Sequence, residues 1–293
     1  MKKLKSLFAG LVLMLATPFV YAAGYMPFIL AKTTSDSVAD ASAKVEAAVK
    51  GKGFEVVGSY QPMDNVKIVV VTNDALKNMA AQSKNGGFGA MERIAIVQKG
   101  GETQISYTNP SYWWNAYQMK GDITPVQTAL EGALGKQQEF GADEPMSADD
   151  LREYHYKMMM PYFEDVDEIA DFDSHDEAVQ TIEKGLAAQK AGVVKVYRID
   201  IPNSKMTVFG VQFTKGDGAD ATILKSIDAG KLSHAAHLPY ELLVVDDEAI
   251  ALNGKFRIAL SWPSLSMMGS NSFMSISNAP YAITEALEEV AEH

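Results

Sequence analysis

The chain has 293 residues, of which 47% are hydrophobic and 22% are charged, and it contains no cysteine. This composition excludes global disorder and collagen-like or low-complexity sequence, and the length is typical of about two domains. Without cysteine the protein has no disulfide, thiolate zinc site, iron–sulfur cluster or thiol nucleophile.

The first residues have the pattern of a bacterial secretory signal. Three lysines among the first five residues precede an apolar stretch over residues 7–19, and Val20-Tyr21-Ala22 supplies a cleavage sequence. We therefore expect residues 1–22 to be a signal peptide and the protein to be periplasmic or secreted. The apolar stretch is too short to cross a bilayer of roughly 30 Å, so no membrane span is expected after cleavage.

The mature chain is strongly acidic. Three of its 26 basic residues lie in the signal, which leaves 23 against 37 acidic residues and a net charge of −14. Residues 139–177 hold 14 of the carboxylates against only Arg152 and Lys157. Nucleic acid and anionic membrane surfaces repel such a chain, so neither is expected as a partner.

The predicted elements occur in the same order twice. The first unit, residues 24–135, is predicted to contain a strand over 28–32, a helix from Asp36 to Gly51, strands over 54–60 and 66–72, a short helix over 75–82, a hairpin of 93–98 with 103–107, and a helix from an N-cap at Thr124 to Gly135.

The second unit, residues 174–293, repeats this order. It is predicted to contain a helix from Ser174 to Gly192, strands over 193–199 and 206–213, a short helix over 220–227, a hairpin of 242–245 with 256–260 across Asn253-Gly254, and a final helix over 282–291. In this alignment Ile105–Pro110 matches Ile258–Pro263. We therefore predict an α+β fold of two tandem βαββαββα-like units, with antiparallel sheets and helices packed on one face. Residues 136–173 are predicted to be an acidic connector that contains Met and Tyr residues.

The segment His234–Val245, followed by Ile258–Pro263, resembles the end of the family called domain of unknown function 302. Members of that family carry Leu-Pro before a strand, a turn, a second strand that ends in Pro, and a C-terminal helix. The resemblance implies two tandem copies, better matched in the second, with a small α+β fold akin to the TATA-binding-protein arrangement. It also implies self-association, and hence a homo-oligomer, but no chemistry. Family members often have Cys after Leu-Pro, whereas this chain has Tyr240.

His234, His237 and Glu241 are candidate metal ligands. Their spacing of i, i+3 and i+7 would align three ligands along a helix. Pro239 interrupts such a helix, and a bent loop would have to bring the two imidazoles together instead. The alternative interpretation is that these residues have a structural role where a loop enters a strand.

Methionines are grouped at two places. Met158–Met160 follow His155 and Tyr156, and Met267-Met268 follow Trp262. In an exported protein, thioether and imidazole groups suit a soft ion such as Cu(I). The alternative interpretation is that methionine, a flexible filler of irregular cores, docks the connector onto a unit.

Tyr112, Trp113, Trp114 and Tyr117 follow Pro110 within a single short segment. They are candidates for an aromatic platform that binds a small apolar ligand or a protein partner. The alternative interpretation is that they seal the first unit against the connector or the second unit. Four large rings cannot all face one core from one short helix, so we expect at least one to be exposed or interfacial.

Motifs of the common catalytic sites are absent from the sequence, which has no P-loop, Gly-x-Ser-x-Gly or His-Glu-x-x-His. The sequence favours an exported, non-catalytic binding protein that holds a small apolar or amphipathic ligand, or a partner, and uses no cofactor. The alternative is a copper- or zinc-binding protein, or a metal-dependent enzyme, that uses His234, His237 and Glu241 with nearby Met.

Overall fold

Two antiparallel sheets, with helices between and around them, form the part of the chain that this computed structural model describes, residues 24–292. The predicted α+β fold is confirmed. The predicted signal peptide, residues 1–22, lies outside the described residues. Within residues 24–292, none of the helices combines the length and the apolar character needed to cross a membrane.

The first sheet has six strands in the order β2-β3-β4-β5-β1-β6. Its strands are β1 (Phe28–Thr34), β2 (Glu55–Met63), β3 (Val66–Thr72), β4 (Glu92–Lys99), β5 (Glu102–Thr108) and β6 (Gln138–Phe140). Helices α1 (Val38–Lys50) and α4 (Thr124–Leu134) pack against each other and against this sheet. Helix α1 begins after Ser37, whose side chain accepts from the Asp40 backbone N–H, and it buries Val45 and Val49, one turn apart.

The second sheet has five strands in the order β7-β11-β10-β9-β8. Its strands are β7 (Val166–Asp171), β8 (Val193–Asp200), β9 (Met206–Phe213), β10 (Tyr240–Val245) and β11 (Glu248–Leu252). Helices α6 (His175–Ala187) and α9 (Ala279–Ala291) cover it. The predicted cap at Ser174 is present, since its side chain accepts from the Glu177 backbone N–H.

The two sheets share one strand order when β1 to β5 are matched, in chain order, to β7 to β11. The helices correspond as well. Helices α1 and α4 match α6 and α9, α2 (Asp74–Ala80) matches α7 (Asp220–Ile227), and α3 (Pro110–Ala116) matches α8 (Gly254–Ser261). This correspondence supports the predicted internal duplication.

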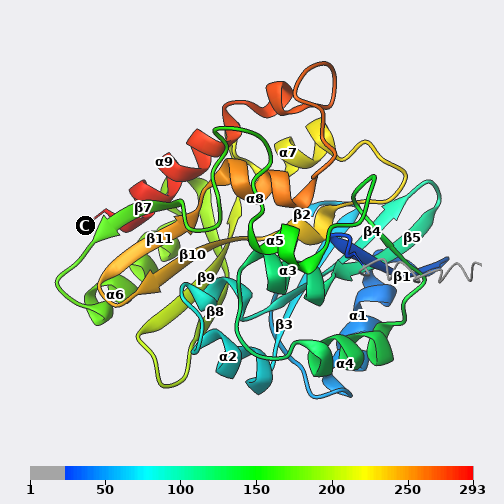
Figure 1. The fold of residues 1–293 in the computed structure, drawn as a ribbon, viewed down its shortest axis with the longest axis horizontal. Coiled ribbons are helices and arrows are strands. Elements are labelled where there is room, and N and C mark those ends of the chain that lie inside the picture. Colours follow the sequence, from blue (N-terminus) through cyan, green and yellow to red (C-terminus); the bar gives the residue numbers. More distant parts are fainter. Residues whose placement is uncertain (1–23, 293) are drawn as a thin grey trace, which may run out of the picture.

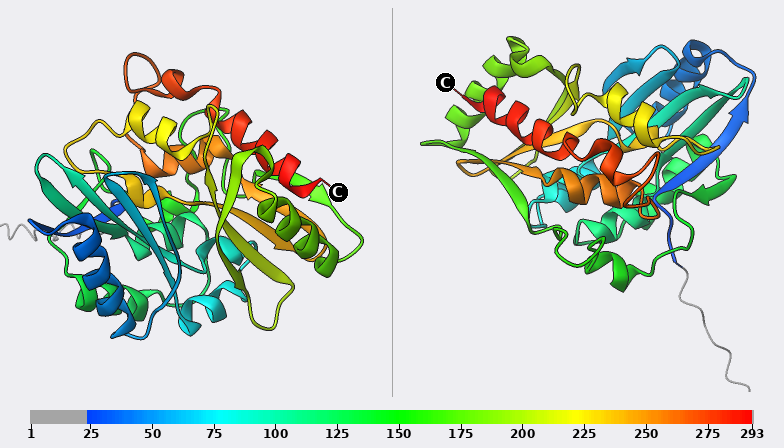
Figure 2. Two further views of the ribbon diagram at one scale, coloured as in Figure 1. Left: turned by 180° about the vertical axis from the view of Figure 1, so that it is seen from behind. Right: turned by 90° about the horizontal axis from the view of Figure 1, so that it is seen from above.

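The contacts between the halves are reciprocal. The short turn η1 (Gly86–Gly89) packs on β9 and β10, and its counterpart η3 (Ala235–His237) packs on β3, β4 and β5. The edge strands β2 and β8 lie against each other. Figures 1 and 2 show α3 and α8 in the middle of the molecule, between the two halves. The halves therefore meet with pseudo-twofold symmetry, as the subunits of a dimer do.

The prediction of a strand over residues 256–260 is wrong, because these residues form α8. The hairpin partner of β10 is β11, reached by a tight turn in which Asp246 has a φ of 53°. Asn253 then caps α8 by accepting from the Lys255 backbone N–H. Helix α8 is buried on nearly all sides, so its residues lack the alternation of polar and apolar positions that marks a surface helix.

This correction changes the internal alignment. Residues 258–263 do not correspond to residues 105–110, since the latter end β5 and begin α3. Asn253 corresponds instead to Asn109, because each precedes the helix that follows the hairpin. The N-cap predicted at Thr124 is also one residue off, since Thr124 is the first residue of α4 and Ile123 precedes it.

The segment predicted as a connector, residues 136–173, contains three short elements. These are β6, α5 (Ala148–Arg152) and β7. Strand β7 pairs with β11, so the second sheet begins before residue 174. The strand is hard to recognise because it lies at the sheet edge, carries three acidic residues and buries only Ile169.

Candidate functional site

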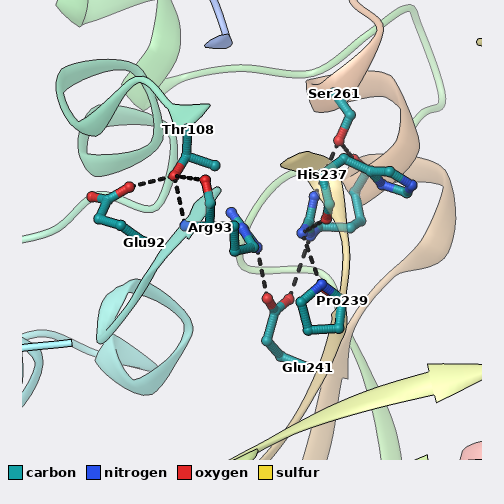
Figure 3. A network of polar contacts seen from close by, with 8 residues as sticks. Glu92, Arg93, Thr108, His237, Pro239, Glu241 and Ser261 are labelled. Carbon is teal, nitrogen blue, oxygen red and sulfur yellow. Dashed lines mark hydrogen bonds and ion pairs between the residues drawn. The ribbon is translucent and has the colours of Figure 1, made fainter. Parts of the chain in front are cut away.

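A buried group of three charged side chains joins the two halves. Arg93, the second residue of β4, donates through Nη1 to Oε1 of Glu241, the second residue of β10, over 2.6 Å. Nε of Arg257, on α8, lies 3.5 Å from the other carboxylate oxygen. No more than 2% of any of these side chains is exposed. Figure 3 shows the Glu241 carboxylate with the dashed contacts that reach it from β4 and α8.

Two guanidinium groups share one carboxylate, so this charged group is net positive. The Nη1 atom of Arg257 donates to Ser261 Oγ over 3.1 Å, and Nη2 donates to two backbone carbonyls, one of them that of His237. The Trp113 ring centre lies 4.7 Å from the guanidinium carbon of Arg93 and 4.8 Å from that of Arg257. The carbonyl dipoles and the ring stabilise the second cation where a second carboxylate is missing.

Two further carboxyl groups are buried close to the same interface. Thr108 donates through Oγ1 to Glu92, and Tyr60 of the first half donates to Asp220 of the second over 2.8 Å. Burial raises the pKa of Glu92 to about 7 and that of Asp220 to about 7. Both groups therefore change charge near neutral pH.

His237 is enclosed beside the charged group. Within the described residues, neither of its ring nitrogens has a hydrogen-bond partner. Its ring lies 4.6 Å from that of Trp262 and 5.5 Å from that of Tyr240. Burial, reinforced by the positive charge of Arg257, lowers the pKa of His237 well below its usual value, so the ring is neutral at pH 7.

His234 lies closer to the surface and is held by Asp228. Its Nδ1 is 3.2 Å from Asp228 Oδ1, and its backbone N–H donates to the same oxygen over 2.9 Å. Burial by itself raises the pKa of Asp228, but the hydrogen bonds from His234 and Ser233 outweigh it and hold that pKa below its usual value. The ionised carboxylate of Asp228 favours the His234 tautomer with its proton on Nδ1, and in that tautomer Nε2 is the acceptor.

An open groove of about 320 Å³ lies beside His234. Its walls come from the connector, from the end of α7 and the loop after it, and from the segment after α8; the lining residues are Gly141, Ala142, Asp143, Ile227, Gly230, His234, Trp262, Ser264 and Leu265. The rings of His234 and Trp262 lie 5.3 Å apart. Phe28 and Phe140 of the first sheet pack against His234 at 5.4 and 5.7 Å. The groove therefore combines apolar residues with a few polar ones, among which the imidazole of His234 is oriented by Asp228, as in small-molecule sites.

The predicted metal ligands His234, His237 and Glu241 do not come together as a metal site. Across residues 24–292, no three His, Cys, Asp or Glu side chains are grouped to hold a metal ion. The Glu241 carboxylate is bound by two guanidinium groups, which repel a further cation. The two histidines face different surroundings, one the groove and the other the interior.

The four aromatic residues Tyr112, Trp113, Trp114 and Tyr117 are all buried, with at most 5% of each exposed. They do not form a platform open to solvent. Helix α3 is surrounded, because Tyr112 donates to the Leu260 carbonyl of the second half and Tyr117 stacks on Phe163 of the connector. Tyr112, Trp113 and Tyr117 meet the expectation of an interfacial position, and none of the four rings is exposed.

The methionine groups lie away from the groove lining. Met158 and Met159 occupy an exposed turn of the connector, and Met268 is exposed after α8.

Sequence reasoning missed Arg93, Arg257 and Asp228. A usable signal was present for Arg93 and Glu241, since each precedes an apolar strand, Ile94–Val97 in one case and Leu242–Val245 in the other. Charged residues next to buried strands need a partner, and these two have opposite signs. Asp228 gives no such signal, because it follows α7 in a loop.

No protein-family model, curated protein or solved structure matches this chain. The resemblance to domain of unknown function 302 therefore stays a prediction.

Proposed function

We propose that this protein is an exported, non-catalytic binding protein that holds a small amphipathic molecule in the groove beside His234. The export pattern of residues 1–22 supports a periplasmic or secreted location. The observation that carries the ligand proposal is the His234 imidazole, oriented by Asp228 and placed beside Trp262 in an open groove.

The groove chemistry favours one class of ligand. With Nδ1 of His234 engaged by Asp228, Nε2 is the ring atom left for a ligand, and in the Nδ1–H tautomer it accepts a hydrogen bond from a hydroxyl or amino group. Ile227, Trp262 and Leu265 offer apolar surface for the rest of the molecule. The favoured ligand is therefore a small molecule with an apolar body and one hydroxyl or amino group.

The contacts of Ser264 favour binding over nucleophilic catalysis. Its Oγ accepts from the Asp143 backbone N–H over 2.8 Å, and among the described residues no hydrogen bond joins it to His234. A serine nucleophile is activated by a hydrogen bond to its base. The pair of His234 and Asp228 is thus better placed to anchor a ligand than to activate a serine.

Native mass spectrometry of the protein purified from its own cells tests this proposal. We expect a stoichiometric mass excess from a bound organic molecule. The variant Gly230→Leu should lose it, because Gly230 lines the groove and an added Cβ would meet its nearest atom at 3.5 Å, an ordinary contact, so we expect a larger side chain to be accepted there and to narrow the groove.

The matched control is Gly132→Leu on α4, where an added Cβ lies 3.7 Å from the nearest atom and far from the groove lining. It should keep the full mass excess. A wild-type protein without bound molecules, or equal retention in Gly230→Leu, would contradict the proposal.

A further inference from the structure

The exposed methionines of the connector have no packing role in the described structure. Met158 and Met159 expose 84% and 95% of their surface. The buried residues that dock this segment are Tyr154 and Phe163, on either side of the turn. Methionine as a core filler therefore does not explain Met158 and Met159, although such exposure of apolar side chains is unfavourable.

The backbone at this turn also lacks a folding reason for methionine. The Met160 N–H donates to the Lys157 carbonyl over 2.9 Å, which places Met158 and Met159 at the two corners. Met159 has a φ of 68°, in the left-handed region where glycine and asparagine are preferred. Neither the backbone conformation nor packing therefore explains an exposed methionine at this position, which leaves its thioether free to bind an ion.

An imidazole lies at the same place. His155, Met158, Met159 and Met160 all line one open pocket of about 560 Å³. The His155 ring packs on that of Tyr162 with 4.6 Å between ring centres, which holds the imidazole at the pocket wall. The thioether arms are long and unhindered, so they can turn toward an ion beside the imidazole.

The charges around this pocket are mixed. Lys255 lines the pocket and donates to the hydroxyl of Tyr281, and Lys157 lies over the Tyr156 ring at 5.3 Å, so both ammonium groups are held by aromatic side chains. The carboxylate of Asp165 lines the same pocket.

We propose that His155, Met158, Met159 and Met160 bind one soft monovalent metal ion, Cu(I) or Ag(I). Thioether sulfur and neutral imidazole are the protein ligands that Cu(I) prefers, whereas neutral thioethers bind hard cations poorly. The site shares no residue with the groove beside His234, so it does not depend on the function proposed above.

Competition for Cu(I) tests this site on the whole protein. Protein is titrated into the coloured Cu(I)–bicinchoninate complex with ascorbate present, and we expect it to withdraw one equivalent of Cu(I). The double variant Met158→Leu/Met159→Leu should bind Cu(I) at least tenfold more weakly. Leucine keeps the apolar volume and removes only the sulfur, so the loss separates metal binding from apolar docking.

Two further variants complete the test. His155→Phe keeps an aromatic ring against Tyr162 and should also weaken binding, whereas Met267→Leu/Met268→Leu, an adjacent pair on another loop, should bind as the wild type does. The proposal is overturned if the wild type fails to compete, if Met158→Leu/Met159→Leu binds normally, or if the Met267–Met268 pair proves equally necessary. All the substituted methionines are at least partly exposed, and circular dichroism verifies that each variant is folded.

Discussion

Glu241 is the residue whose charge matters most to the interface between the halves. It is the single carboxylate bound by both Arg93 and Arg257, and all three side chains are shielded from water. Removing one member of such a buried group leaves an uncompensated charge in the interior. The free-energy cost of that charge exceeds the net stabilisation that the intact group provides.

We predict that Glu241→Gln lowers the free energy of unfolding by about 3–5 kcal/mol, because two guanidinium groups lose their counter-ion. Urea unfolding followed by circular dichroism measures the change. Glu183→Gln is the control, since Glu183 contacts Lys195 and Arg198 at the surface and should contribute at most about 1 kcal/mol. Equal effects of the two variants would show that burial does not determine how much these ion pairs contribute to the free energy of unfolding.

Glu92 and Asp220 make stability depend on pH. Their pKa values are raised by burial from their usual range to about 7 in the folded chain. Both groups are therefore protonated in the folded state, but ionised in the unfolded state, between about pH 4 and pH 7. The unfolded state binds fewer protons there, so their contribution to stability is complete below about pH 4 and is lost as the pH rises through 7.

The double variant Glu92→Gln/Asp220→Asn should remove this part of the pH dependence. For the wild type we expect each carboxyl to reduce the free energy of unfolding by on the order of 3 kcal/mol between pH 4 and pH 8. Urea midpoints measured across this range for both proteins give the difference. Parallel pH profiles for wild type and variant would be inconsistent with the raised pKa values.

At the level of elements, helix α3 lies between the halves, and its aromatic side chains contact both of them. Its rings contact both guanidinium groups, the second half and the connector. An aromatic helix in this position belongs to the core of the whole molecule and not to one unit.

Trp113→Ala should therefore lower the free energy of unfolding by about 3–5 kcal/mol, through a cavity and the loss of the ring between Arg93 and Arg257. The control is Tyr281→Ala on α9, where 59% of the tyrosine is exposed and only a small change is expected. Thermal and urea unfolding measure both variants. If Trp113→Ala is as stable as the control, the ring does not contribute to the core, and the aromatic platform for a ligand becomes the better interpretation.

The elements with clear local signals could be predicted from the sequence. Helix α7 was expected over residues 220–227 and occupies Asp220–Ile227, because apolar residues at helical spacing mark it. The strand β7 and the helix α8 were missed for opposite reasons, since β7 is an acidic edge strand and α8 is buried almost all round. The position of each segment in the tertiary structure determines its pattern of polar and apolar residues, and the local sequence does not reveal that position.

The candidate site could be predicted only in part. His234 was predicted only as a metal ligand, with a structural role as the alternative, and its partner Asp228 and the groove depend on how three distant segments meet. Arg93 and Glu241 are 148 residues apart, so their pairing follows from the match between β4 and β10 and not from any local motif.

At the scale of the whole molecule, the two halves are packed together through polar and apolar contacts. Ion pairs, the bond between Tyr60 and Asp220, and the reciprocal packing of η1 and η3 all cross between them. An interface of this buried and charged kind predicts a single cooperative unfolding transition.

Gly58→Ala tests the contact of the edge strands. A Cβ on Gly58 of β2 would lie 2.5 Å from the Val196 carbonyl oxygen of β8, so the halves must shift apart. We expect a loss of about 1–3 kcal/mol in the free energy of unfolding, and scanning calorimetry should still show one transition in the wild type. Gly132→Ala on exposed α4 is the control and should stabilise slightly. Two separate transitions in the wild type would mean that the halves fold independently.

A crystal structure of the protein purified from its own cells tests the central proposal most directly. We predict electron density for a small organic molecule in the groove, with a hydroxyl or amino group within hydrogen-bond distance of His234 Nε2. Density for a ligand elsewhere, such as among the rings of α3, or a groove filled only with water, would contradict it.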